Sequence, residues 1–353
     1  MALSEILSLF SFGITTKDIK EAINWLKKNS TPYLNYNVEL ILKTYAKTPN
    51  ILKSPKSFNS IKTPYVIEYD FRDRAVPNSL GIVNCIGFYE YPPELLPHRK
   101  AMVSIFAKEG RLKKGNLPCP RVKDFYITDS GELGLDIEQA AYYDQVGSNL
   151  TLDYPLQDRP QGVPDPCSTV REWDLHNSKG TMLLPKLQAS RLANTIGVAV
   201  GITATDKFGQ RQILKRKRGN KVAVYANQWH VPFSFAQEWD NRLVIGQSIS
   251  LSEFIFRDYG HELAEELPGL ATADFEPPRL LAFCRDLVRG GKPQFFIELH
   301  SNIPMEDLRS RIHSDDFAEY EDETGTVGST QSGMSPELLA FSVLVGTTKF
   351  GAT

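Results

Sequence analysis

Short apolar runs dominate the first part of the chain. They are rich in β-branched and aromatic residues and are separated by proline and glycine, which predicts strands. The runs cover residues 63–71, 80–91, 101–107 and 123–129. Before them, residues 15–29 carry apolar side chains at helical spacing behind a threonine that can cap a helix. Residues 1–154 are therefore predicted to form an α+β domain.

A second pattern begins after the proline-rich stretch PLQDRPQGVPDPCS at residues 155–168. Prolines and glycines at this density are typical of a linker, which we place at residues 155–189. Beyond it, residues 194–206 are a continuous apolar run that predicts a buried strand, and residues 211–219 predict its hairpin partner. Residues 190–353 are therefore predicted to form a second domain.

Three further elements are predicted in this second domain. Residues 251–267 carry an apolar residue at every fourth position from Leu251, which predicts one helix. Residues 279–300 fit either a helix followed by a strand or a β-hairpin broken at RGGKP, and the pattern leaves both open. Ser335 and Pro336 cap a last apolar element, ELLAFSVLV.

The predicted helix at residues 251–267 carries acids near its C-terminal end. Glu262, Glu265 and Glu266 stand just before Pro268. Aligned peptide dipoles make that end partly negative, so each acid there is disfavoured by roughly 0.3–1 kcal/mol. On a helical wheel the three acids fall within one arc, and converging carboxylates are the oxygen donors that Mg²⁺ prefers. A solvated acidic face is the alternative, and the spacing alone leaves both interpretations open.

Composition limits the classes of function. The chain has 353 residues and a formal net charge of −2, which creates no overall field to attract nucleic acid or a membrane surface. The four cysteines are far apart and form no CxxC pair, which argues against a zinc site or a disulfide framework and predicts a cytoplasmic protein. The apolar N-terminus is interrupted by Glu5 and lacks basic residues, so no signal peptide is predicted. No apolar run is long enough to cross a membrane.

Around the clustered glutamates, the sequence resembles the Nudix box, G-x5-E-x7-R-E-U-x-E-E-x-G-U, in which U is a bulky aliphatic residue. The chain has Gly246, Glu253 and then HELAEELPGL at residues 261–270. It departs from the pattern at three points. Six residues rather than five follow Gly246, His261 replaces the arginine, and one extra residue precedes Gly269.

Two flanking segments extend the resemblance. Residues 197–232 are similar to the first hairpin of Nudix proteins and to the tyrosine and Trp-x-x-Pro segment that follows it. Residues 284–299, CRDLVRGGKPQFFIEL, resemble a subgroup of larger Nudix-like proteins that includes UDP-glucose pyrophosphatase-like members, which favours the hairpin for residues 279–300. The resemblance implies an α/β fold, a Nudix-like α/β/α sandwich with a mixed sheet, over residues 190–350. Residues 1–185 match no pattern known to us.

The resemblance also implies a metal site on the acidic helix. In the family, glutamates at these positions bind Mg²⁺ or Mn²⁺, which implies Glu262, Glu265 and Glu266 as metal ligands. Glu298 is a further candidate ligand, with a hydrogen-bonded strand residue as its alternative. The metal would neutralise a diphosphate and activate water, so Glu265, Glu266 and His261 are the candidate catalytic residues.

The predicted hairpin supplies candidate substrate contacts. Arg216 and Lys217 could reach a diphosphate, or they could belong to a solvated basic turn. Tyr225 and Trp229 could stack on a base, or they could be aromatic residues of the core. Sequence alone leaves each of these pairs of alternatives open.

Two functions follow from these observations. The first is a Nudix-type pyrophosphohydrolase that hydrolyses a nucleoside diphosphate linked to another moiety, and the subgroup resemblance slightly favours a nucleotide sugar. The second is a catalytically weakened nucleotide-sensing or binding module, because an imidazole at His261 does not replace the bidentate fork of an arginine. Both predict a small nucleotide as the partner, with neither a membrane nor nucleic acid, and a homodimer is left open.

Overall fold

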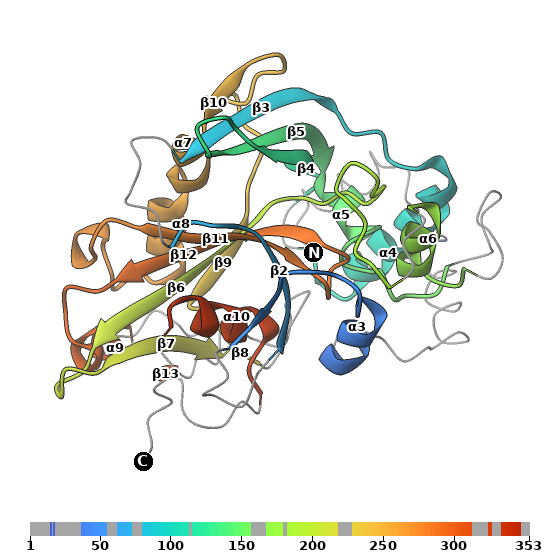
Figure 1. The fold of residues 1–353 in the computed structure, drawn as a ribbon. Helices are drawn as coiled ribbons and strands as arrows, with labels where there is room; N and C mark the ends of the chain where they lie inside the picture. The colour runs from blue at the N-terminus through green and yellow to red at the C-terminus, as the bar shows by residue number, and fades with distance from the viewer. Residues whose placement is uncertain are drawn as a thin grey trace.

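The computed structural model of the chain describes residues 15, 17, 37–54, 62–72, 80–112, 115–156, 167–178, 182–217, 228–312, 324–326 and 333–346. These residues form two mixed β-sheets with helices packed around them (Figure 1). The prediction of a mixed α and β fold is confirmed. The predicted helix at residues 15–29 lies outside the described residues, apart from residues 15 and 17.

The larger sheet has the hydrogen-bonded order β1-β2-β11-β12-β6-β7-β13, and β8 and β9 pair with β7 and β6. Strands β12 and β6 run parallel, and the other pairs are antiparallel. The sheet is therefore mixed, as predicted. Its strands are β1 (Ile51–Lys53), β2 (Lys62–Asp70), β6 (Gly197–Thr205), β7 (Arg211–Lys217), β8 (Trp229–His230), β9 (Phe233–Ala236), β11 (Arg279–Asp286), β12 (Lys292–His300) and β13 (Thr324–Thr326).

The smaller sheet has the order β10-β3-β5-β4. Strands β3 and β5 are parallel, whereas β4 and β10 run antiparallel to their neighbours. Figure 1 shows this sheet stacked against the larger one. Its strands are β3 (Gly81–Phe88), β4 (Pro118–Ile127), β5 (Leu133–Ala141) and β10 (Ser248–Ser250).

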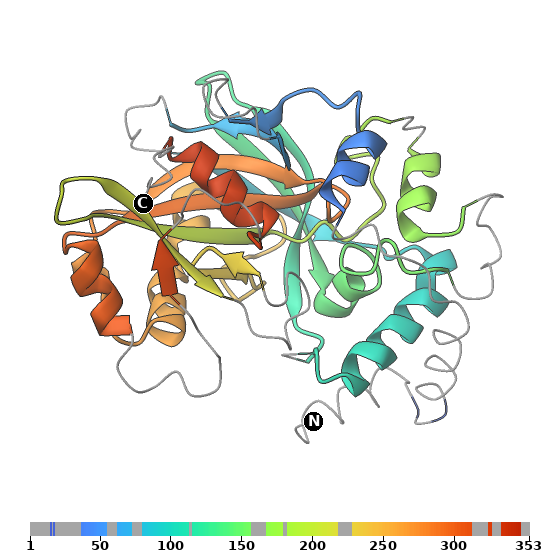
Figure 2. The same ribbon diagram turned by 90° about the horizontal axis from the view of Figure 1, so that it is seen from below.

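Helices are packed on both faces of the larger sheet and beside the two sheets. Figures 1 and 2 show α3 to α6 gathered at one end of the molecule, and Figure 2 shows α10 lying across the strands of the larger sheet. The described residues also include the short 3-10 helices η2 (Pro93–Leu95) and η3 (Thr272–Asp274). The α-helices are α3 (Val38–Thr44), α4 (Leu96–Lys108), α5 (Tyr142–Val146), α6 (Val170–Asn177), α7 (Leu251–Phe256), α8 (Tyr259–Glu266), α9 (Met305–Ile312) and α10 (Pro336–Leu344).

The two faces of the larger sheet enclose different cores. Alternate side chains of a strand point to opposite faces. Ile297 of β12 belongs to the main core, which also contains α8, α9 and the inner face of the smaller sheet. Phe296, the preceding residue, belongs to the core under α10. The sheet therefore lies between α10 on one side and helices α7 to α9 with the smaller sheet on the other.

In both sheets, a strand from before the predicted linker pairs with a strand from after it. Strand β2, from the first 154 residues, pairs with β11 of the larger sheet. Strand β10, from the region beyond residue 190, pairs with β3 of the smaller sheet. The sequence predicts two domains divided at residues 155–189, and the described strands on the two sides of this segment share sheets and a core.

Several predicted elements are confirmed. Strands β6 and β7 form the expected hairpin, with Ile202 opposite Leu214. Residues 279–300 form a hairpin, because β11 and β12 pair antiparallel across the turn. The Ser335 hydroxyl accepts a hydrogen bond from the Leu338 backbone N–H and caps α10.

Two predictions about element type and length were wrong. Residues 101–107, predicted as a strand, lie inside helix α4, where most side chains are buried. A short apolar run buried on all sides has no periodicity to distinguish a helix from a strand. The single helix predicted at residues 251–267 is divided into α7 and α8 at Arg257 and Asp258. The Arg257 guanidinium binds Asp240 and Asp258, which holds this junction against the preceding loop.

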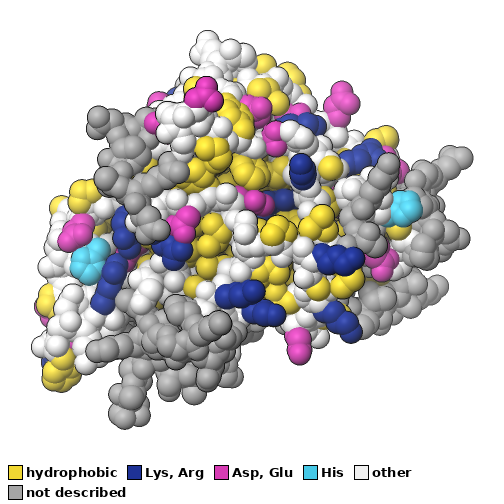
Figure 3. Space-filling view, viewed as in Figure 1, with side chains coloured by type: hydrophobic (Ala, Val, Ile, Leu, Met, Phe, Trp, Pro, Cys, Tyr) yellow, Lys and Arg dark blue, Asp and Glu magenta, His cyan; other side chains and the backbone are white. Residues whose placement is uncertain are grey.

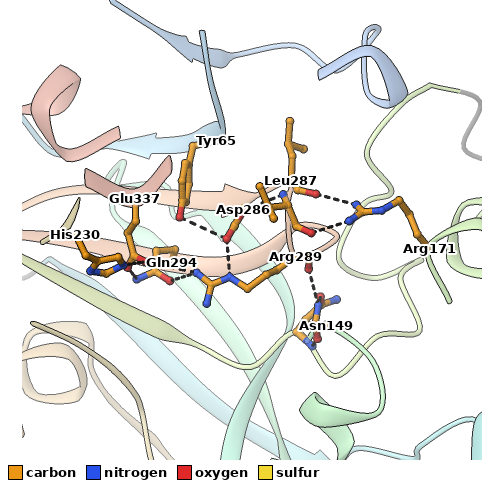
Figure 4. A network of polar contacts seen from close by, with 11 residues as sticks. Tyr65, Asn149, Arg171, His230, Asp286, Leu287, Arg289, Gln294 and Glu337 are labelled. Atoms are coloured by element: carbon orange, nitrogen blue, oxygen red, sulfur yellow. Dashed lines mark hydrogen bonds and ion pairs between the residues drawn. The ribbon is translucent and has the colours of Figure 1, made fainter. Parts of the chain in front are cut away.

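A buried polar network ties α10 to the strands (Figure 4). The Glu337 carboxylate is 2.8 Å from His230 Nε2 and accepts a hydrogen bond of 3.1 Å from Gln294. Arg289 continues the network, because its guanidinium donates to Asp286 and to Gln294. Charged groups removed from water need such partners, so the network orders the turn between β11 and β12 and the start of α10.

Candidate functional site

Helix α8 carries the acidic residues singled out from the sequence. Leu263 is buried in the main core and sets the inner side of the helix. Glu262 and Glu266 are half-buried beside it, and Glu265 is exposed. Ser250 accepts a hydrogen bond from the Glu253 backbone N–H at the start of α7, so Glu253 stands at the beginning of this helical region rather than among the acids of α8.

An arginine from the larger sheet reaches the C-terminal end of α8. Arg216 Nη1 lies 2.9 Å from the Glu266 carboxylate and 3.1 Å from the Glu266 backbone carbonyl. The cation sits where the helix dipole is negative, and it offsets the cost of placing an acid there. The structure therefore brings Arg216 to a predicted metal ligand, and the last glutamate of the helix has a partner within the protein.

His261 and Glu265 form a second pair on α8. His261 Nδ1 is 3.5 Å from a Glu265 carboxylate oxygen, one helical turn away. Both side chains are exposed, at 73% and 62%. An exposed pair at this spacing stabilises a helix by only about 0.2–0.5 kcal/mol, so these side chains are free to reorient toward a ligand.

Glu298 is not brought to the α8 glutamates. Its neighbours Ile297 and Leu299 point into the core that contains α8, so Glu298 points to the α10 side of the sheet. There its buried carboxylate accepts hydrogen bonds from Arg211, Arg279 and Thr203. The structure places it as a hydrogen-bonded strand residue on the face opposite α8.

The candidate substrate contacts lie in several places. Lys217, which pairs with Trp229 across β7 and β8, shares the α10 side of the sheet with the Trp229 ring. Lys215 Nζ stands 4.1 Å from the centre of that ring, a cation–π contact. Tyr225 lies outside the described residues. Trp229 therefore packs beside the core under α10, away from the α8 glutamates.

The acids of α8 suit a divalent cation by the chemistry of their donors. Mg²⁺ and Mn²⁺ prefer carboxylate oxygens, and Glu262, Glu265 and Glu266 supply them from one helix. Their arrangement in the structure is different from that of a closed site, because Arg216 pairs with Glu266 and the exposed Glu265 lies beside His261. Within the described ranges, no three His, Cys, Asp or Glu side chains are grouped closely enough to hold a metal ion.

Some charged residues of note were not found from the sequence. Arg211 and Arg279 converge on Glu298 across three strands, and Lys292 is buried at the start of β12. The pattern of polar and apolar positions in a sequence does not distinguish a buried lysine or arginine from an exposed one. The register of the β11–β12 hairpin would have paired Arg279 with Glu298, because the two residues face each other across the strands.

The charges and cysteines fit the expectations from composition. Figure 3 shows Lys and Arg side chains in separate groups among acidic and apolar ones on the face it draws, so charge there is local. All four cysteines are free and buried, which confirms the absence of a disulfide framework. Within the described part of the chain, every helix is too short or too polar to cross a bilayer.

Solved structures that resemble the chain include a Nudix hydrolase. A Nudix hydrolase from M. smegmatis, RenU, aligns over 43% of this chain and 81% of its own length, with 12% sequence identity and a TM-score of 0.26. A similarity at this level does not establish a shared fold or a shared activity. No protein-family model matches the chain, and no curated protein matches it.

Proposed function

We propose that this chain hydrolyses a nucleoside diphosphate linked to another moiety, with a nucleotide sugar as the favoured substrate. The observation that best supports the proposal is the arrangement of α8. Three glutamates that match the Nudix box by position stand on one helix, and Arg216 of β7 pairs with the last of them, Glu266.

Different residues of the chain would bind the metal, accept a proton and contact the substrate. Mg²⁺ or Mn²⁺, held by Glu262, Glu265 and Glu266, would supply charge neutralisation and an activated water. Glu265 is exposed and pairs with His261 rather than with an arginine among the described residues, so it can accept a proton from water. Arg216 fixes the Glu266 side chain and adds positive charge where a diphosphate would lie.

A second function, nucleotide binding without hydrolysis, is favoured by the same ion pair. The Arg216 guanidinium neutralises the Glu266 carboxylate, and a divalent cation would have to compete with it for that oxygen. In this case the acidic helix takes part in binding a nucleotide and not in hydrolysing it. His261, which stands where the Nudix box has an arginine, is consistent with a loss of hydrolysis.

One assay separates the two functions. Phosphate-bond hydrolysis is measured over nucleotide sugars, ADP-ribose, dinucleotides and nucleoside triphosphates with Mg²⁺ or Mn²⁺. Wild type is compared with Glu265→Gln/Glu266→Gln and with the control Glu253→Gln, an exposed acid of α7. A hydrolase is expected to lose at least about 100-fold in rate in the double variant, because metal stabilisation of a transition state is worth several kcal/mol.

The control variant is expected to keep the wild-type rate. Turnover that persists in the double variant would contradict the assignment of α8. If wild type shows no turnover on any substrate, calorimetric titration with the same nucleotides decides between the functions. A nucleotide that binds without being hydrolysed supports the binding module, and neither binding nor hydrolysis contradicts both proposals.

A further inference from the structure

Two arginines donate hydrogen bonds to one buried carboxylate on the α10 side of the larger sheet. Glu298 on β12 is 2% exposed. Arg279 of β11 donates to one carboxylate oxygen, with Nε at 3.0 Å, and Arg211 of β7 donates to the other. The Thr203 hydroxyl on β6 also donates to Glu298, at 2.7 Å. Four strands of one sheet therefore build this cluster, so its geometry is set by the sheet.

The outer sides of both guanidiniums remain available. The Arg279 side chain is 46% exposed and the Arg211 side chain 36% exposed, although both bind Glu298. Arg211 Nε is buried and has no hydrogen-bond partner among the described residues. An arginine presents five N–H donors in a planar fork, so donors remain on each side chain after Glu298 is bound.

The two guanidiniums of the cluster lie close enough to repel each other. Both face the buried Glu298 carboxylate, and the exposed Glu276 is a second acid near Arg211. Burial lowers the pKa of Arg211, and the nearby Arg279 lowers it further. The pKa of His300 is also lowered, by burial and then by Arg211. Two cations that repel each other are stabilised when an anion binds between them.

We propose that Arg211 and Arg279 form a binding site for the phosphate group of a small ligand. Glu298 holds the inner edges of the two guanidiniums in place, and their outer N–H groups converge on the phosphate oxygens. Arginine forks match phosphate oxygens in pairs of parallel hydrogen bonds, which gives both affinity and orientation. The site uses no residue of α8, so this proposal does not depend on the proposed hydrolase activity.

The test is a calorimetric titration of the full chain with inorganic phosphate, with ionic strength held constant by sodium chloride. Wild type is expected to bind phosphate, and Arg279→Gln and Arg211→Gln are each expected to weaken binding about tenfold or more, because each removes charge-assisted hydrogen bonds. Arg279→Lys keeps a charge beside Glu298 and loses the fork, so it is expected to fold and still to lose affinity.

The matched control is Arg242→Gln. Arg242 is 44% exposed and is paired with Asp240, so it resembles Arg279 in exposure and in having a carboxylate partner. It is expected to bind phosphate as wild type does. The proposal is overturned if wild type does not bind phosphate, if Arg242→Gln weakens binding as much as Arg279→Gln, or if acetate at the same ionic strength binds equally well. AMP and O-phosphoserine carry the group on different molecules, and the tighter binder identifies the class of ligand.

Discussion

Lys292 is a cation that the fold buries almost completely. It is 2% exposed at the start of β12. Burial and then the nearby Arg289 lower its pKa to about 7, against the opposing influence of Glu337 and Asp286. The folded state therefore favours the neutral amine, and a proton on Lys292 opposes folding.

Lys292 should make stability depend on pH in a defined window. Its pKa is depressed in the folded state relative to the ordinary value of 10.5, so between about pH 7 and 10.5 the unfolded chain binds a proton that the native chain does not. The free energy of unfolding should therefore rise with pH in this window, relative to Lys292→Met, by up to about 1.4 kcal/mol per pH unit. Denaturant unfolding at a series of pH values measures the difference.

Lys53→Met is the control for this prediction, because Lys53 is an exposed strand lysine. It should leave the pH dependence of wild type unchanged. A difference between wild type and Lys292→Met that stays flat from pH 7 to 10 would show that Lys292 keeps its ordinary pKa in the fold.

At the scale of elements, α10 is held to the larger sheet by both polar and apolar contacts. Glu337, near the helix start, is tied to His230 and Gln294, while Phe341, one turn on, lies over Gly201 of β6. A methyl group on Gly201 would come within 2.0 Å of the Phe341 ring. The close approach of the helix therefore depends on the absence of a side chain at this strand position.

Gly201→Ala is expected to destabilise the protein by about 1–3 kcal/mol, because overpacking forces the helix or the ring to move. Gly87→Ala is the matched control in strand β3, where an added methyl group meets nothing within 4 Å. Chemical denaturation measures both variants. Phe341→Leu should recover part of the loss in the background of Gly201→Ala, and no coupling between the two changes would indicate that this contact does not hold α10.

At the scale of the whole molecule, the two sheets share one core. Val122 and Ile137 of the smaller sheet belong to the same buried cluster as Val200 and Ile297 of the larger one. Strand β2 also completes the larger sheet beside β11. Segments on both sides of residues 155–189 therefore depend on each other for burial and for backbone hydrogen bonds.

We predict that residues 190–353 do not fold as a separate unit. The fragment lacks β2, which leaves the edge of β11 unpaired, and it lacks the smaller sheet's side of the main core. The full chain should unfold in one cooperative transition by calorimetry, whereas the fragment should show none. A sharp transition and dispersed amide resonances in the fragment would instead support two separate domains.

The sequence by itself determined the elements with strong local signals. The β6–β7 hairpin, the cap at Ser335 and the mixed α and β character follow from apolar periodicity and turn residues, which act over a few positions. The three acids of α8 were also found from spacing, because residues three and four apart on a helix share a face. Local signals failed where burial is complete, as in α4, whose apolar run was predicted as a strand.

Only the tertiary structure decided which charges meet. Arg216 is fifty residues from Glu266, and Arg211 is eighty-seven residues from Glu298, so no local pattern could pair them. The face on which Glu298 lies depended on the register of β12 against β6 and β11, and a shift of one residue would have reversed it. Sheet register and long-range packing therefore determine which charged side chains pair, because they bring together residues that are far apart in the sequence.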